Sequence, residues 1–116
     1  MKVRVGIVGG AGYTGGEAIR ILLRHPQVEL VFVHSNSNGG NLLSDVHADL
    51  FGETDMRFTD RLSTDVDLLM LCVGHGDARK WMEAHPLPGS VRVIDLSQDF
   101  RLAAGATFGD RNFVYG

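Results

Sequence analysis

Four short apolar runs, rich in β-branched residues, are separated along the chain by polar or glycine-containing segments. Apolar runs of this length are typical of strands buried on both faces of a parallel sheet. They predict strands over residues 3–8, 28–34, 67–73 and 91–96. Residues 56–59 carry a weaker version of the pattern and predict one more short strand.

The segments between these runs place apolar residues at helical spacing. After the first glycines, Ala18, Ile21 and Leu22 fall on one face of a helix. We expect this helix to span residues 17–24, with Glu17 in its first turn, where a negative charge suits the helix dipole. Further helices are predicted over residues 77–85 and, as a short one, within residues 42–51.

Strands that alternate with helices predict an α/β fold, because parallel strands need helical crossover connections. We expect a Rossmann-type, doubly wound, mostly parallel sheet with helices on both faces. Ligands of such sheets bind beyond the carboxyl ends of the strands. The glycine clusters and Ser97 each follow a predicted strand, so they should gather at that edge.

Composition excludes several classes of function. The net charge is −3 and no face is rich in Lys or Arg, which argues against a nucleic-acid or membrane-surface partner. The apolar N-terminal run is too short for a signal peptide, so we expect a cytoplasmic protein. The histidines form no metal-ligand pattern, so no metal is predicted. A length of 116 residues favours one domain, spanning residues 1–116.

A glycine motif follows the first predicted strand and opens the first helix. It can be written Gly10-x-Gly12-x-x-Gly15, and this context is the one a dinucleotide-binding fingerprint requires. Glycines allow a tight turn and close approach of a diphosphate, which the helix N-terminus attracts. The alternative is a glycine-rich turn without a ligand. The predicted cofactor-binding residues of this loop are Gly9, Gly10, Ala11, Gly12, Tyr13, Thr14 and Gly15.

The end of the second predicted strand bears on the choice of cofactor. NAD-binding folds usually carry an acidic residue there, which bonds the ribose hydroxyls. Here Ser35, Asn36 and Ser37 offer small polar groups and no acid, which favours NADP. No Arg lies in this loop to strengthen the choice, and the alternative is a solvated loop without meaning for the cofactor.

The loop after the third long apolar run holds Gly74, His75 and Gly76, and we expect its backbone to contact the cofactor. The alternative for His75 is a surface position. Cys72 lies within an apolar run, where a free thiol behaves as a small hydrophobe, so we predict no catalytic role for it. No catalytic residue is predicted in the chain.

Residues 95–102, which follow the start of the last apolar run, contain two carboxylates, the Ser97 hydroxyl and Arg101. Arg101 could bind a phosphate or carboxylate through its planar fork, or form an internal ion pair with a neighbouring acid. The residues alone leave these two readings open. Ser97 is predicted to lie beside the cofactor.

Three segments resemble N-acetyl-γ-glutamyl-phosphate reductases. The glycine loop is similar to that family's G-x-x-G-Y-S/T-G, residues 93–102 to its V-I-D-L-S-A-D-F-R-L, and residues 114–116 to its V-Y-G. Residues 44–47 are a weaker match. The likeness runs through the whole chain in order. The second segment distinguishes this family from aspartate-semialdehyde dehydrogenases, which share the glycine loop.

The resemblance implies an NADPH-dependent reduction of an acyl phosphate to N-acetylglutamate semialdehyde in arginine biosynthesis, by a homo-oligomeric enzyme. It implies a 2′-phosphate contact from Ser35 and a substrate contact from Arg101, whereas Asn36 stands where the family often has Arg. The family's nucleophilic cysteine lies in a P-G-C motif after V-Y-G. We therefore expect residues 1–116 to be the cofactor-binding part of a longer two-domain enzyme, lacking the substrate domain and inactive alone. The alternatives are a non-catalytic Rossmann-like binding module and a fragment of an aspartate-semialdehyde dehydrogenase.

Overall fold

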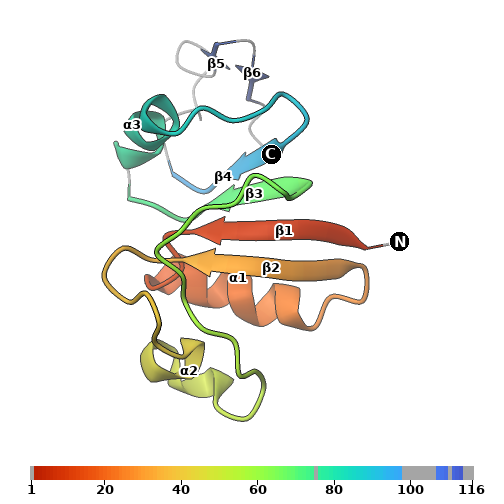
Figure 1. Ribbon diagram of the computed structural model, residues 1–116, viewed down its shortest axis with the longest axis vertical. Coiled ribbons are helices and arrows are strands. Elements are labelled where there is room, and N and C mark those ends of the chain that lie inside the picture. The colour runs from red at the N-terminus through yellow and green to blue at the C-terminus, as the bar shows by residue number, and fades with distance from the viewer. Residues whose placement is uncertain (1, 75, 98–106, 110, 114–116) are drawn as a thin grey trace.

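A sheet of four parallel strands forms the centre of the computed structural model, which describes residues 2–74, 76–97, 107–109 and 111–113 (Figure 1). The sheet has the order β2-β1-β3-β4, with β1 spanning Val3–Val8, β2 Val28–His34, β3 Leu68–Leu71 and β4 Arg92–Asp95. The bounds predicted for the first two strands are confirmed, and the last two are shorter than predicted. Because β2 and β3 lie on opposite sides of β1, the chain reverses its winding direction at β1.

Helices follow the strands at the predicted places. They are α1 over Tyr13–Leu23, the one-turn α2 over Leu43–Val46 with a 3-10 turn η1 over Ala48–Leu50, and α3 over Asp77–Ala84. A short antiparallel pair, β5 (Thr107–Phe108) and β6 (Arg111–Asn112), lies beyond β4 at the top of Figure 1. No pattern in the sequence predicted this pair.

The sheet is covered on both faces, as predicted. On one face Ile7 of β1 packs in a core cluster with Ile19 of α1. On the other face the next residue, Val8, packs in a second cluster with Met82 of α3. Successive side chains of a strand point to opposite faces, so β1 contributes to both cores. The α/β, doubly wound, mostly parallel architecture is therefore confirmed.

The first helix differs from its predicted form in two ways. It begins in the glycine motif, four residues before Glu17, so no acidic residue lies in its first turn. Its buried side is formed by Gly15, Ala18 and Ile19, whereas Ile21 is 58% exposed. Gly15, Ala18 and Ile19 have i, i+3, i+4 spacing and so share one face of the helix, and Ile21 lies outside this face. The prediction that Ile21 shares the buried face was therefore wrong.

Residues 56–59 do not form the predicted strand. Thr59 makes one parallel bridge with His34, and Arg57 makes one antiparallel bridge with Leu42. The segment therefore crosses from one neighbour to another, and no continuous ladder forms. Its apolar character is explained by Phe58, which is buried in the α1-side core.

Candidate functional site

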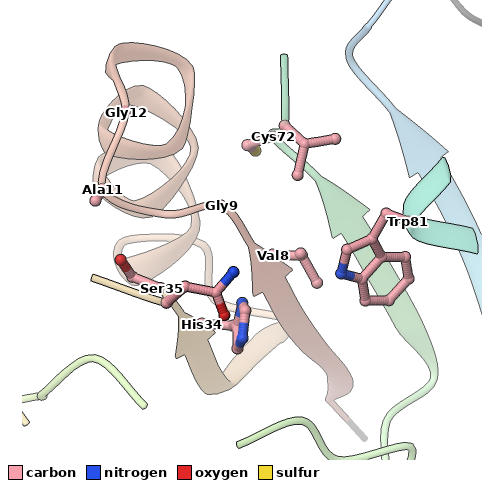
Figure 2. Close-up of a pocket in the computed structure, with 10 residues that line it drawn as sticks. Val8, Gly9, Ala11, Gly12, His34, Ser35, Cys72 and Trp81 are labelled. Carbon is pink, nitrogen blue, oxygen red and sulfur yellow. The ribbon is translucent and has the colours of Figure 1, made fainter. Parts of the chain in front are cut away.

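A cavity of about 220 Å³ opens at the carboxyl ends of β1, β2 and β3 (Figure 2). It is lined by Val8, Gly9, Ala11, Gly12, His34, Ser35, Asn36, Cys72, Val73 and Trp81. The fold thus brings the glycine loop, the loop after β2 and the end of β3 to one place. This is the point where the winding direction reverses, which is the position expected for a ligand of a doubly wound sheet.

The glycine loop is fixed to the strands on both sides of it. The backbone N–H groups of Gly9 and Gly10 both donate to the carbonyl of His34, at 3.1 and 3.0 Å. Gly9 adopts a φ of +77°, which side chains disfavour. A Cβ there would also lie 2.8 Å from the carbonyl oxygen of Cys72. Glycine is therefore required at Gly9 both for the turn and for the approach to β3.

Close packing explains two further glycines of the motif. A Cβ at Gly10 would lie 2.1 Å from a methyl group of Val33, and one at Gly15 would lie 2.6 Å from the Cα of Gly10. Gly12 differs, because a Cβ there would meet no atom within 4 Å. Gly10 and Gly15 let α1 press against the sheet, while Gly12 leaves open space in front of the helix.

Within the described residues, the N-terminus of α1 has no side-chain cap and no acid in its first turn. Its N-cap residue, Gly12, makes no side-chain hydrogen bond to the helix, and the first turn carries no acid. The first N–H groups of a helix have no partner within the helix, and they carry a partial positive charge. An anion such as a diphosphate suits this position.

His47 supports the glycine loop from the far side. Its Nε2 donates to the carbonyl of Gly10 at 2.7 Å. Its ring also fills the space beside Gly16, where a Cβ would lie 2.6 Å from Nδ1. Asp45 accepts a hydrogen bond from the backbone N–H of Leu42 at 3.0 Å. Sequence reasoning missed this role of His47, because the contact joins residues far apart in the chain.

The loop after β2 joins a second segment that sequence reasoning did not include. Ser35 is buried, and its N–H donates to the carbonyl of Thr59 at 2.9 Å. Asn36 and Ser37 are exposed, and Asn36 lines the cavity whereas Ser37 does not. Asp60 packs against the same loop, where its Cβ lies 3.0 Å from the position of a Cβ at Gly39. An acid is therefore near the loop, although none stands within it.

Three side chains at the cavity differ in their chemistry. Burial, together with the charge of Asp95, raises the pKa of the Cys72 thiol to about 11. The thiol is therefore protonated at neutral pH. Burial, and then the charge of His85, lowers the pKa of His34, so its ring is neutral. Among the described residues, His34 Nδ1 and Trp81 Nε1 have no hydrogen-bond partner.

The other predicted site residues lie outside the cavity wall. Tyr13 and Thr14 are exposed in the first turn of α1. Gly74 and Gly76 begin α3: the carbonyl of Gly74 accepts the N–H of Asp77 at 3.0 Å, and Gly76 is the N-cap with a φ of +87°. His75 and Arg101 lie outside the described residues.

Ser97 follows β4 at the same edge of the sheet and is 5% exposed. Its N–H and hydroxyl donate to the two carboxylate oxygens of Asp95, at 2.9 and 2.8 Å. In the part of the chain that the structure describes, no group of three His, Cys, Asp or Glu side chains could hold a metal ion. None of the described helices is long and apolar enough to cross a membrane.

Comparison with known proteins agrees with this geometry. Residues 4–116 match the family model described as semialdehyde dehydrogenase, NAD binding domain. The chain belongs to this family. Its relatives include the N-acetyl-gamma-glutamyl-phosphate reductases of Bacteroides thetaiotaomicron and Parabacteroides distasonis, each 51% identical over 98% of the chain. The chain spans about a third (34%) of the length of these relatives.

Two solved structures share the fold. The aspartate semialdehyde dehydrogenase of Candida albicans, solved with NADP, superposes with a TM-score of 0.69 at 16% identity, over 87% of this chain and 31% of that one. Aspartate semialdehyde dehydrogenase II of Vibrio cholerae gives 0.60 at 21% identity, over 90% and 30%. At these identities the likeness concerns the fold.

Proposed function

We propose that this chain binds NADP(H) as the cofactor-binding part of an N-acetyl-γ-glutamyl-phosphate reductase. The observation that carries the proposal is the N-terminus of α1. Its N-cap residue, Gly12, makes no side-chain hydrogen bond to the helix, and a Cβ at Gly12 would meet no atom within 4 Å. Gly9, Gly10 and Gly15 allow the tight turn and close packing that hold the loop in this position, since a Cβ at each would collide with the protein itself. The diphosphate of the cofactor suits the partial positive charge at this position.

The preference for NADP rests on the end of β2. Ser35 and Asn36 line the cavity there, and none of its described lining residues is an acid. Small polar donors suit a 2′-phosphate, whereas an acid would bind the free ribose hydroxyls of NAD. Asp60 packs against the same loop at Gly39, and its negative charge would repel a 2′-phosphate. We propose that this repulsion reduces the preference for NADP over NAD without reversing it. The fungal structure of the same fold, which carries NADP, supports the assignment.

The reaction we propose for the whole enzyme is the reduction of an acyl phosphate to an aldehyde in arginine biosynthesis, in the cytoplasm and by a homo-oligomer. Support comes from the relatives' name and from residues 93–102. Bound NADPH supplies the hydride. The residues of this chain bind and orient the cofactor, and Arg101 is proposed to hold the substrate. Since the Cys72 thiol is protonated at neutral pH, we expect no acyl transfer to this chain.

Calorimetric titration with NADP and with NAD tests the proposal. We expect saturable binding of NADP with a smaller Kd than that of NAD. Circular dichroism on the same sample establishes that the chain is folded. A folded sample that binds neither nucleotide would refute the cofactor assignment, and tighter binding of NAD would refute only the preference for NADP.

A further inference from the structure

The loop after β2, at the left of the sheet in Figure 1, contains the dipeptide Asn38-Gly39. An asparagine followed by glycine can lose its side-chain amide. The backbone nitrogen of the next residue attacks the amide carbon, and glycine has no side chain to hinder the attack. The other asparagines of the chain, Asn36, Asn41 and Asn112, do not precede a glycine. The reaction is therefore expected at one position, provided that the fold leaves its reacting groups free.

The attacking group is the backbone nitrogen of Gly39. Gly39 is exposed, and its N–H makes none of the hydrogen bonds found among the described residues. The N–H groups on either side of it in the turn are held. That of Gly40 donates to the carbonyl of Phe58 at 2.8 Å, and that of Asn41 donates to the carbonyl of Asn38 at 3.0 Å. The turn is thus fixed around a nitrogen that has no hydrogen bond to break before it attacks.

The amide under attack, that of Asn38, is half-buried and weakly held. Its Oδ1 accepts a hydrogen bond from Nδ2 of Asn41 at 3.3 Å. Its Nδ2 donates to the hydroxyl oxygens of Ser37 and Ser35 at 3.2 and 3.5 Å. All three contacts are longer than the usual length of about 2.9–3.0 Å, so little free energy opposes rotation of the side chain. The donor at Oδ1 also stabilises the negative charge that this oxygen gains during the attack.

Asn41 lies in the same loop and lacks these conditions. It is more exposed than Asn38, but the next residue is Leu42, whose side chain hinders the approach to its nitrogen. The N–H of Leu42 also donates to the carboxylate of Asp45 at 3.0 Å, and an attack on Asn41 would have to break this bond. Asn41 is therefore an internal control for the effect of the local structure.

We propose that Asn38 is a site of spontaneous deamidation and that the carboxylate formed there weakens the binding of NADP. The nitrogen of Gly39 loses its proton to water and bonds to Cγ of Asn38. The bond from Cγ to Nδ2 breaks, and Nδ2 takes up a proton from water and leaves as ammonia. Water then opens the succinimide ring to aspartate or isoaspartate. The net reaction consumes one water molecule and releases one ammonia molecule, and it needs no other reactant.

The consequence for binding rests on the proposed cofactor binding. Ser35 and Asn36 of the same loop line the cavity where we place the 2′-phosphate. Asp60 already packs against this loop, with its Cβ 3.0 Å from the position of a Cβ at Gly39. A further negative charge at position 38 therefore repels the 2′-phosphate of NADP more strongly than it affects the uncharged ribose hydroxyls of NAD.

Incubation of the wild-type chain at pH 8 without nucleotide, followed by peptide mapping with mass spectrometry, tests the modification. We expect Asn38 to convert to a mixture of aspartate and isoaspartate, while Asn36 and Asn41 keep their amides. Asn38→Gln should keep its amide at this position, because the same attack would have to close a larger ring. An unmodified Asn38, or conversion of Asn41 at the same rate, would overturn the proposed site.

Calorimetric titration tests the consequence. Asn38→Asp, and the deamidated wild type separated by anion exchange, should bind NADP with a Kd raised roughly three- to tenfold and NAD with a smaller rise. The ratio of the two Kd values is the readout, because a misfolded sample would lose both nucleotides.

Asn112→Asp is the matched control. Asn112 is exposed on β6, away from this loop, so the same added charge should leave both Kd values unchanged. An equal rise of both Kd values in Asn38→Asp, or the same change in the control, would overturn the effect on NADP. A wild type that binds neither nucleotide would refute the proposed function, and peptide mapping would still decide whether Asn38 is modified.

Discussion

Two glycines of the same motif should respond differently to alanine. A Cβ at Gly15 would lie 2.6 to 2.7 Å from the Cα, C and O atoms of Gly10, which are backbone atoms and cannot rotate away. A Cβ at Gly12 would meet nothing within 4 Å. Gly15→Ala therefore tests the packing of α1 on the loop, and Gly12→Ala tests the space in front of the helix.

The magnitudes follow from competing terms. In a free helix Gly15→Ala would gain about 1 kcal/mol from helix propensity. Overpacking costs about 1–3 kcal/mol, and because the contacted atoms are backbone atoms we take the upper part of this range, about 2–3 kcal/mol. The expected net loss of unfolding free energy is therefore about 1–2 kcal/mol. At Gly12 the poorer N-cap and the reduced entropy of the unfolded chain roughly cancel, so stability should change by less than about 0.5 kcal/mol.

Cofactor binding should separate the two variants further. A methyl group at Gly12 occupies the approach proposed for the diphosphate, so the Kd of NADP should rise at least about tenfold while stability is retained. Gly15→Ala should weaken binding together with stability, since it displaces the loop. Gly89→Ala is the control for an open glycine, because a Cβ there also meets nothing within 4 Å and Gly89 lies in the turn before β4.

Urea denaturation gives the stability and calorimetric titration gives the Kd on the same preparations. If Gly12→Ala bound NADP as tightly as the wild type, the diphosphate could not approach at this position. If Gly15→Ala were as stable as the wild type, the close packing of α1 on Gly10 would not constrain the loop. Either result would refute the corresponding part of the reasoning.

Three other predictions concern residues around the cavity. His47→Ala removes the 2.7 Å hydrogen bond to Gly10 and leaves a buried carbonyl unpaired, so denaturation should show a loss of about 1–3 kcal/mol, and titration a weaker NADP complex. Glutamine at this position should restore part of both, and no difference between the two variants would contradict the role of the donor. Asp60→Asn removes a negative charge beside the loop after β2, so the Kd of NADP should fall by a larger factor than the Kd of NAD. An equal fall of both Kd values would show that the 2′-phosphate lies elsewhere. Alkylation of Cys72 by iodoacetamide should be slow at pH 8 and rise with a midpoint near the raised pKa of about 11; a midpoint near the ordinary value of 9.0 would contradict its burial. Because the folded thiol keeps its proton between these two values and the unfolded thiol loses it, stability should fall as pH rises through that window, by at most about 3 kcal/mol.

The four strands of the parallel sheet and the position of the glycine loop followed from the sequence alone. Apolar runs of strand length, interrupted by glycine, are local signals, and the two faces of β1 require cover on both sides. The start of α1 did not follow from them, because its glycines are poor helix formers. Gly15 is helical in the structure because it packs directly on Gly10, and this contact also decides which side of α1 is buried.

The composition of the candidate site depended on the tertiary structure. Local sequence identified Gly12 and Ser35, which follow strands directly. His34 and Trp81 belong to a strand and a helix, where an apolar surrounding is the ordinary expectation, and Asp60 reaches the β2 loop from a segment without regular structure. Their proximity arises because parallel strands end at one edge of the sheet, and the order of those strands is set by long-range packing rather than by neighbouring residues.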